Sequence, residues 1–377
     1  MIRDIFRIHG DCDARFAPVR EAFSRNFQDH GEVGAAVAVM VGGQKVVDLW
    51  GGAKDKAGTQ PWTSDTLVNV WSSTKGVNAI CFAMLADRGA LSYEDPVSKY
   101  WPEFGVRGKE AVTIGMLLSH QAGLSGFSEP AGLEDLLAGA PAAARLAAQA
   151  PFWPPGSGSG YHAISVGILS AELFRRIEGR SLKRFIADEL EGRLGIDLSL
   201  GLPGDREDRV AEMIAPAAME SSSIASATPA QHAALGNPSL DPLLPNTAAW
   251  RAAELPSANG FTNARSLARL YASVLVSSPN RLLGETALQA ATRTQVEGVD
   301  LVMGTPARWG AGFLLNSDGL YGPGPNSFGH SGWGGSFAFA DPDRAIAISY
   351  TMNAMTEALQ GDPRAAGLID AVYRAWA

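Results

Sequence analysis

Strand-like groups of apolar residues lie near both ends of the chain. Close to the N-terminus, Ala35–Val41 and Gln44–Trp50 are apolar-rich segments separated by two glycines, which predicts a β-hairpin with a tight turn. Close to the C-terminus, Ser336–Ala340 and Arg344–Met352 flank an Asp-Pro-Asp turn, and alternate residues of each segment are apolar. This second pattern predicts another hairpin.

Helical periodicity is clearest in three other segments. Residues 14–29 have the spacing of an amphipathic helix. The chain closes with a second helix, for which Asp362 is the expected N-cap and Pro363 the first helical residue. A third helix is expected to start near Ser72 and to end at Gly89, a glycine placed as at a helix C-terminus. Its apolar residues repeat with helical spacing at Val77, Ile80, Cys81, Met84 and Leu85.

Few strand-like patterns occur between residues 90 and 190, where the spacing of apolar residues is mostly helical. Helices are predicted at Thr113–Ser119, Leu136–Gln149 and Gly167–Glu178. Residues 215–248 are rich in Ala, Ser and Pro, which predicts a long surface excursion with little regular structure.

Strands at both ends with helices between them predict an α/β fold of the α+β type. The simplest arrangement is one antiparallel sheet built from both termini and flanked by the first and last helices, with a mainly helical domain inserted. We place the α/β domain at residues 1–80 and 157–377 and the helical domain at residues 81–156.

Composition and charge narrow the possible functions. The 377 residues are 46% hydrophobic and 19% charged, as in an ordinary soluble globular protein. A net charge of −8 without a cluster of Lys and Arg argues against a nucleic acid as partner. The two cysteines predict no disulfide framework, and their spacing with histidines matches no metal-site motif, so we expect neither a metal nor another cofactor.

The expected location rests on two features of the sequence. The first residues, Met1–Arg7, lack the apolar run of a signal peptide. The longest apolar stretch, Ala35–Val41, is too short to span a bilayer. We therefore expect a cytoplasmic protein that does not enter a membrane.

An S-x-x-K motif is formed by Ser72 and Lys75 at the start of an apolar helix. A serine is a poor nucleophile until a nearby group takes its proton. A lysine three residues further along a helix lies one turn away, with its amine within reach of the hydroxyl. The N-terminal end of a helix also favours developing negative charge, because its first backbone N–H groups are free. The motif thus predicts a nucleophilic serine assisted by a lysine.

Further motifs follow in a fixed order along most of the chain. They are Asp95-Pro96-Val97, Leu117-Leu118-Ser119-His120-Gln121-Ala122-Gly123-Leu124, Trp153-Pro154-Pro155-Gly156, Tyr161-His162-Ala163 and Gly329-His330-Ser331-Gly332-Trp333-Gly334-Gly335. Together with the S-x-x-K motif, this set resembles that of the serine β-lactamase and penicillin-recognising superfamily. Within it, the chain is similar to the family VIII carboxylesterases, which share the class C β-lactamase fold. The resemblance implies a β-lactamase/transpeptidase-like fold.

The resemblance also implies roles for the site residues. Ser72 would be the nucleophile, and Lys75 and Tyr161 would form a general-base pair that exchanges its proton. Either member could hold the charge, because burial lowers the pKa of a lysine while a nearby ammonium lowers that of a tyrosine. The backbone N–H groups of Ser72 and Trp333 would form the oxyanion hole.

Two substitutions bear on the expected substrate. In the β-lactamase relatives, an asparagine and a lysine help to bind the amide side chain and the carboxylate of the drug. Here Ala163 and His330 stand at these positions. Alanine offers no side-chain hydrogen bond and histidine is only partly charged at neutral pH, so a neutral ester is favoured over a β-lactam. The residues expected to bind substrate are His330, Ser331, Gly332, Trp333, Phe127, Phe152, Trp153 and His162.

These observations predict a serine carboxylesterase that hydrolyses short-chain acyl esters of small molecules through an acyl-enzyme. Weak hydrolysis of some β-lactams stays open, since the nucleophile and the oxyanion hole are intact. An amidase or D-aminopeptidase-like hydrolase, or an acyltransferase, would use the same acyl-enzyme. An inactive relative that binds an acylated ligand is a further alternative, against which the complete set of Ser72, Lys75 and Tyr161 argues.

Overall fold

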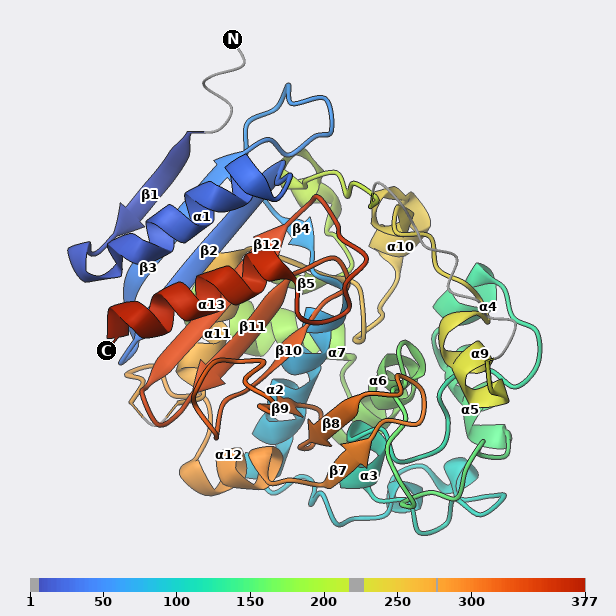
Figure 1. Ribbon diagram of the computed structural model, residues 1–377. Helices are drawn as coiled ribbons and strands as arrows, with labels where there is room; N and C mark the ends of the chain where they lie inside the picture. Colours follow the sequence, from blue (N-terminus) through green and yellow to red (C-terminus); the bar gives the residue numbers. More distant parts are fainter. Residues whose placement is uncertain (1–6, 217–226, 276, 377) are drawn as a thin grey trace.

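The computed structural model describes residues 7–216, 227–275 and 277–376 (Figure 1). Residues 1–6, on which the expected location partly rests, lie outside this range, as do residues 217–226 of the Ala/Ser/Pro-rich stretch. Within the described residues, an antiparallel sheet of nine strands in the order β1-β3-β2-β12-β11-β10-β9-β8-β7 forms the centre of the fold. A smaller sheet has the order β4-β6-β5.

One half of the large sheet combines strands from both ends of the chain. Its members are β1 (Ile8–Cys12), β2 (Gly34–Val41), β3 (Gln44–Gly52), β11 (Phe337–Asp341) and β12 (Ile346–Met352). Both predicted hairpins are present, and they meet where β2 pairs with β12, from Val41 opposite Ile346 to Ala35 opposite Met352. The prediction of one antiparallel sheet built from both termini is confirmed.

The other half of the large sheet runs from β10 to the far edge. Its strands are β10 (Phe328–Ser331), β9 (Leu314–Leu315), β8 (Pro306–Trp309) and β7 (Val296–Val299). The smaller sheet consists of β4 (Val68–Asn69), β5 (Leu198–Leu200) and β6 (Gly260–Thr262). The strands β7–β9, each of two to four residues, are too short for a periodic pattern to predict them.

Helices cover both faces of the large sheet (Figure 1). The first and last helices, α1 (Ala17–Asp29) and α13 (Pro363–Trp376), pack together on one face, as predicted. The backbone N–H of Arg364 donates to Asp362 Oδ1 at 2.8 Å, which confirms Asp362 as the N-cap of α13. On the opposite face, α11 (Ala264–Ser273) contacts β2, β11 and β12, and α2 (Thr74–Asp87) contacts β10.

The remaining helices lie mostly between residues 114 and 252 of the chain, and α12 follows later. They are α3 (Ile114–Leu118), α4 (Leu133–Leu137), α5 (Ala140–Ala148), α6 (Ser165–Glu178), α7 (Leu182–Ile186), α8 (Gly192–Leu194), α9 (Pro229–Leu235), α10 (Ala248–Ala252) and α12 (Glu285–Thr292). The division into an α/β domain and a helical domain stays a prediction.

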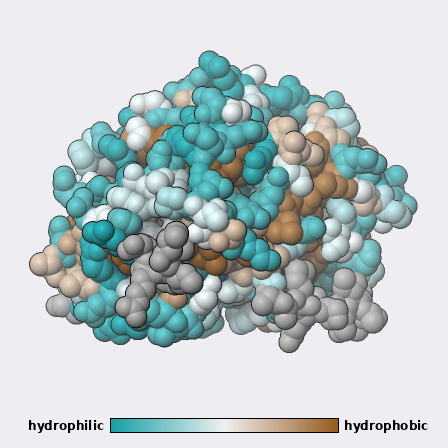
Figure 2. Space-filling model, turned by 90° about the horizontal axis from the view of Figure 1, so that it is seen from above, coloured by the Kyte–Doolittle hydropathy of each residue, from teal (hydrophilic) through white to brown (hydrophobic). Residues whose placement is uncertain are grey.

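Seen from above, hydrophilic residues cover most of the surface and apolar ones show in patches between them (Figure 2).

Two sequence-based predictions in this region are wrong. The single helix predicted at residues 136–149 is two helices, because Gly139 between them has φ 67°, a left-handed conformation that ends the first helix. The stretch 215–248 contains α9, whose start is fixed by a capping box between Thr228 and Gln231. No helix of the described residues is long and apolar enough to cross a membrane.

The helix that follows the S-x-x-K serine, α2, is enclosed on all sides. Every residue from Thr74 to Leu85 is buried, so the helix is wrapped by protein rather than packed along one stripe. Its C-terminus is closed as predicted, because Gly89 has φ 70° and the N–H of Ala90 donates to the carbonyl of Leu85. The start of α2 is therefore held within a dense core.

Gly76 of α2 lies against Tyr271 of α11. A Cβ at this position would lie 1.8 Å from Tyr271 Oη, and Tyr271 is fully buried. We expect Gly76→Ala to lower the free energy of unfolding by about 1–3 kcal/mol, because overpacking displaces core side chains. Gly367→Ala in α13, where a Cβ meets nothing within 4 Å, is the control and should be stabilising or neutral. Equal denaturation midpoints for the two variants would contradict the expectation.

Candidate active site

Ser72 lies in a short 3₁₀ turn (Trp71–Ser73) directly before α2. Trp71 has φ 45°, a left-handed conformation that is rare for a bulky residue. Its ring packs between those of Trp250 and Trp333, with centroid distances of 5.2 and 5.0 Å. The aromatic contacts hold this unusual backbone, and Ser72 is left half-buried at the wall of a cavity.

The structure brings the two predicted proton-transfer residues to Ser72. Lys75 Nζ lies 3.0 Å and Tyr161 Oη 2.8 Å from Ser72 Oγ. Lys75 Nζ also donates to the carbonyl oxygens of Ala163, at 2.7 Å, and Ser257, at 2.9 Å. A neutral amine has two N–H donors and one lone pair, so these two carbonyls use both donors and leave the lone pair to the Ser72 hydroxyl.

The surroundings favour a neutral Lys75 beside a protonated Tyr161. Burial holds the pKa of Lys75 well below its usual value. Burial raises the pKa of the Tyr161 phenol, and the charge of Asp300 adds to this, against the hydrogen bond with Ser72. Desolvation disfavours the charged form of each group, so these shifts favour Lys75 over Tyr161 as the group that accepts the proton.

Asp300 fixes the backbone around Tyr161. Its Oδ1 accepts the N–H groups of Tyr161, Val302 and Met303 at 2.9, 3.0 and 2.9 Å. This carboxylate is buried and ties the segment after β7 to the strand-free stretch that carries Tyr161. No motif in the sequence predicted this contact, because the partners lie 139 residues apart.

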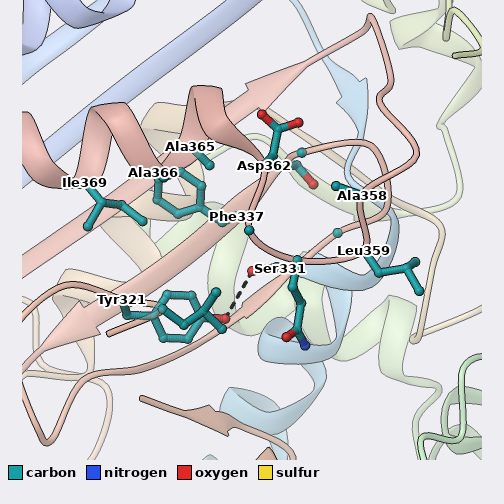
Figure 3. Close-up of a pocket in the computed structure, with 15 residues that line it drawn as sticks. Tyr321, Ser331, Phe337, Ala358, Leu359, Asp362, Ala365, Ala366 and Ile369 are labelled. Carbon is teal, nitrogen blue, oxygen red and sulfur yellow. Dashed lines mark hydrogen bonds between the residues drawn. The ribbon is translucent and has the colours of Figure 1, made fainter. Parts of the chain in front are cut away.

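The cavity at Ser72 has a volume of about 420 Å³. Its other lining residues are Tyr161, Asp300, Met303, Thr305, Pro306, Ala307, Trp309, His330, Ser331, Trp333, Leu359 and Gln360. The residues from β8 and from the loop before α13 were not predicted, since their sequence carries no recognisable chemical motif. A second cavity of about 360 Å³ adjoins it and shares Ser331, Leu359 and Gln360 (Figure 3).

The predicted substrate-binding residues divide into two groups. His330, Ser331 and Trp333 line the cavity at Ser72. Gly332, Phe127, Phe152, Trp153 and His162 are not among its lining residues.

His162, next to Tyr161 in the sequence, is directed into the protein instead. It is fully buried, its Nε2 accepts the N–H of Leu124 at 2.9 Å, and its Nδ1 contacts the carbonyl oxygen of Gly160 at 2.6 Å. Burial lowers the pKa of His162 to about 4, so the ring is neutral. Both ring nitrogens are therefore used by the backbone, and neither is free to bind a substrate.

His330, which replaces the lysine of the β-lactamase relatives, has a pKa below the usual value of a histidine. Its side chain is buried, and Nδ1 lies 2.8 Å from the carbonyl oxygen of Ser331. Burial, the largest cause, lowers the pKa of His330 to about 3. The expected partial charge at neutral pH is thus wrong, and His330 offers this cavity a neutral ring.

A glycine-rich turn after β10 closes the site beside Ser72. A Cβ on Gly332 would lie 2.3 Å from the carbonyl oxygen of Val70, so this glycine lets the turn pack directly against the segment that leads to Ser72. The turn itself is closed by a hydrogen bond of 3.1 Å from the N–H of Gly335 to the carbonyl of Gly332. Within the described part of the chain, the N–H of Trp333 in this turn has no hydrogen-bond acceptor.

A serine, a lysine and a tyrosine arranged in this way beside a sheet built from both termini are typical of a β-lactamase-type site. The beta-lactamase family model matches residues 19–372, and the chain belongs to this family. The esterase/beta-lactamase LipL of Mycobacterium tuberculosis is 35% identical over 367 residues, which cover 94% of this chain and 84% of LipL.

Solved structures give the same result. A family VIII carboxylesterase superposes with a TM-score of 0.93 at 41% identity, over 98% of this chain and 100% of that one. A penicillin-binding protein homolog from Caulobacter crescentus has a TM-score of 0.93 at 43% identity, with the same coverage. The predicted family and fold are confirmed.

Proposed function

We propose that this protein is a serine carboxylesterase that hydrolyses short-chain acyl esters through an acyl-enzyme on Ser72. The observation that carries the proposal is the pair of contacts to Ser72 Oγ, from Lys75 Nζ at 3.0 Å and Tyr161 Oη at 2.8 Å. The esterase LipL and the family VIII carboxylesterase, similar over nearly the whole chain, support an ester as substrate.

In the acylation step, Ser72 Oγ attacks the ester carbonyl and its proton passes to the lone pair of Lys75. The carbonyl oxygen becomes an oxyanion, held by the backbone N–H groups of Ser72 and Trp333. The bond to the alcohol then breaks, and the proton returns to the leaving oxygen through the Lys75/Tyr161 pair. Tyr161 stays protonated before the attack and is suited to donate to that oxygen.

Deacylation repeats these steps with water in place of the alcohol. Lys75, neutral again after the alcohol has left, takes a proton from the attacking water. The new oxyanion uses the same two N–H groups, and its collapse releases the acid and returns the proton to Ser72. No group beyond the three side chains and two backbone donors is needed for the cycle.

The chemistry of the cavity supports an uncharged substrate. Among the described residues that line it, none is Lys or Arg, and His330 is neutral with a pKa of about 3. The carboxylate of a β-lactam would therefore find no cationic partner in the lining, whereas an ester needs none. Apolar side chains such as Met303, Pro306 and Trp309 suit a short acyl or alkyl group.

The proposal is tested by intact-protein mass spectrometry after exposure to a fluorophosphonate, combined with a panel of esters, amides and a β-lactam. We expect a single adduct on Ser72 and a kcat/KM for p-nitrophenyl butyrate that exceeds that for the β-lactam by at least about 10²-fold, because the β-lactam carboxylate has no charged partner. No adduct, or an amide preferred over the ester, would overturn the proposal. Added alcohol in the same assay separates hydrolysis from acyl transfer.

A further inference from the structure

A buried cluster of charged residues lies directly behind the glycine-rich turn that carries Trp333. Arg364, the second residue of α13, is at its centre, with only 1% of its side chain exposed. Its partners come from the α1–β2 connection, the loop after β12, the N-cap of α13 and the glycine-rich turn itself. They are Glu32, Ala354, Asp362 and Gly334.

One of these contacts reaches the turn itself. Arg364 Nη2 donates to the carbonyl oxygen of Gly334 at 2.7 Å, and the N–H of Gly334 donates to the carbonyl of Ala358 at 3.0 Å. A Cβ on Gly335 would lie 2.6 Å from Asp362 Oδ2 and 2.7 Å from Arg364 Nη2, so the cluster touches the turn along its length. Figure 3 shows Asp362 and Ala358 on the loop that passes beside Ser331.

The guanidinium is itself held on several sides. Asp362 binds it through two oxygens, at 3.1 Å to Nε and 2.8 Å to Nη2, and Thr356 Oγ1 donates to Asp362 at 2.8 Å. Glu32 contacts Nη1 at 3.2 Å. Burial raises the pKa of Glu32 to about 7, whereas for Asp362 the Arg364 contacts outweigh burial and lower the pKa. Arg364 therefore pairs chiefly with Asp362, which orients its Nη2 toward Gly334.

We propose that Arg364 is a positioning residue of the esterase reaction, which fixes the Gly332–Gly335 turn so that the N–H of Trp333 meets the oxyanion. The Gly334 carbonyl and the Trp333 N–H are separated by one peptide unit, Trp333–Gly334, whose N–H is held by Ala358. The two anchors together restrict the orientation of the peptide that carries the Trp333 N–H. The inference rests on the proposed function of Ser72 and Trp333. Arg364 touches no reacting atom, and its effect is confined to the transition state, where the oxyanion forms.

The test compares Arg364→Lys with the wild-type protein. Lysine keeps the positive charge but has no planar fork, so it cannot hold Asp362 and Gly334 at once. We expect kcat for p-nitrophenyl butyrate to fall by about tenfold or more with KM changed less than about threefold, because a small misplacement of a donor is costly. The affinity for a trifluoromethyl ketone, which forms a tetrahedral oxyanion on Ser72, should fall by a similar factor.

Two further variants keep the test decisive. Arg265→Lys alters an ion pair between α11 and β3, with Arg265 Nε 2.7 Å from Asp48, and should lower the melting temperature without changing kcat. Asp362→Asn retains a good N-cap but weakens the anchor of Arg364, and should reduce kcat as Arg364→Lys does.

The inference fails if Arg364→Lys and Asp362→Asn lose only thermal stability, or if KM rises alone. Wild-type protein without a Ser72 adduct would instead overturn the proposed function, so the two failures are distinguishable.

Discussion

Ser72→Ala is expected to lower kcat for p-nitrophenyl butyrate by at least about 10³-fold, because it removes the oxygen to which both Lys75 Nζ and Tyr161 Oη are hydrogen-bonded. The remaining donors cannot form an acyl-enzyme, so residual hydrolysis would come from binding and the oxyanion hole alone. Stopped-flow or steady-state release of p-nitrophenol measures the loss. The fluorophosphonate adduct should disappear with the activity.

The neighbouring Ser73→Ala is the matched control. Ser73 is buried and its Oγ lies 3.1 Å from Ser336 Oγ, whereas Lys75 and Tyr161 are hydrogen-bonded to Ser72. We expect this variant to keep its fluorophosphonate adduct and most of its activity. Full activity in Ser72→Ala would show that the wrong serine had been assigned.

Without the family resemblance, the site could be predicted only where its contacts are local in sequence. Ser72 and Lys75 are three residues apart on a helix, and helical geometry alone brings the amine to the hydroxyl. Tyr161 lies 89 residues away, and only the resemblance to a known family placed it at Ser72. The two carbonyls that bind Lys75 belong to Ala163 and Ser257, and no local pattern predicts such long-range partners.

The fold shows the same dependence on local signals. The hairpins near both ends were predictable, because period-two patterning and turn residues act within a few positions. Strands of two to four residues such as β8 (Pro306–Trp309) carry too little periodicity to be recognised, although Trp309 lines the cavity. His162 shows that closeness in sequence can also mislead. It is the neighbour of Tyr161, which suggested a place in the site, but its ring turns away and contacts the backbone of Leu124 and Gly160.

Lys75→Met should reduce kcat/KM by about 10²–10⁴-fold, the range typical of losing a positioned general base. Methionine is similar in length to lysine and keeps the apolar stem in its buried environment, so α2 can still form. The carbonyl oxygens of Ala163 and Ser257 lose a donor in this variant, which costs stability, but the cost of holding a buried lysine neutral is removed as well. The net change in the free energy of unfolding should therefore be small compared with the loss of activity. A variant that reacts with the fluorophosphonate at the wild-type rate would exclude Lys75 as the base.

The pH dependence gives Lys75 a signature that a structural role would not produce. Its folded-state pKa is depressed by burial below the value in the unfolded chain, so catalysis should increase as pH rises through the folded pKa and the amine loses its proton. Between that pKa and the unfolded value of about 10.4, the unfolded chain binds more protons, so the free energy of unfolding should also rise with pH. Lys75→Met should lack both the rising limb of kcat/KM and this increase of the free energy of unfolding with pH. If the two proteins had identical pH profiles, the rising limb of kcat/KM would come from another group, and that group rather than Lys75 would be the general base.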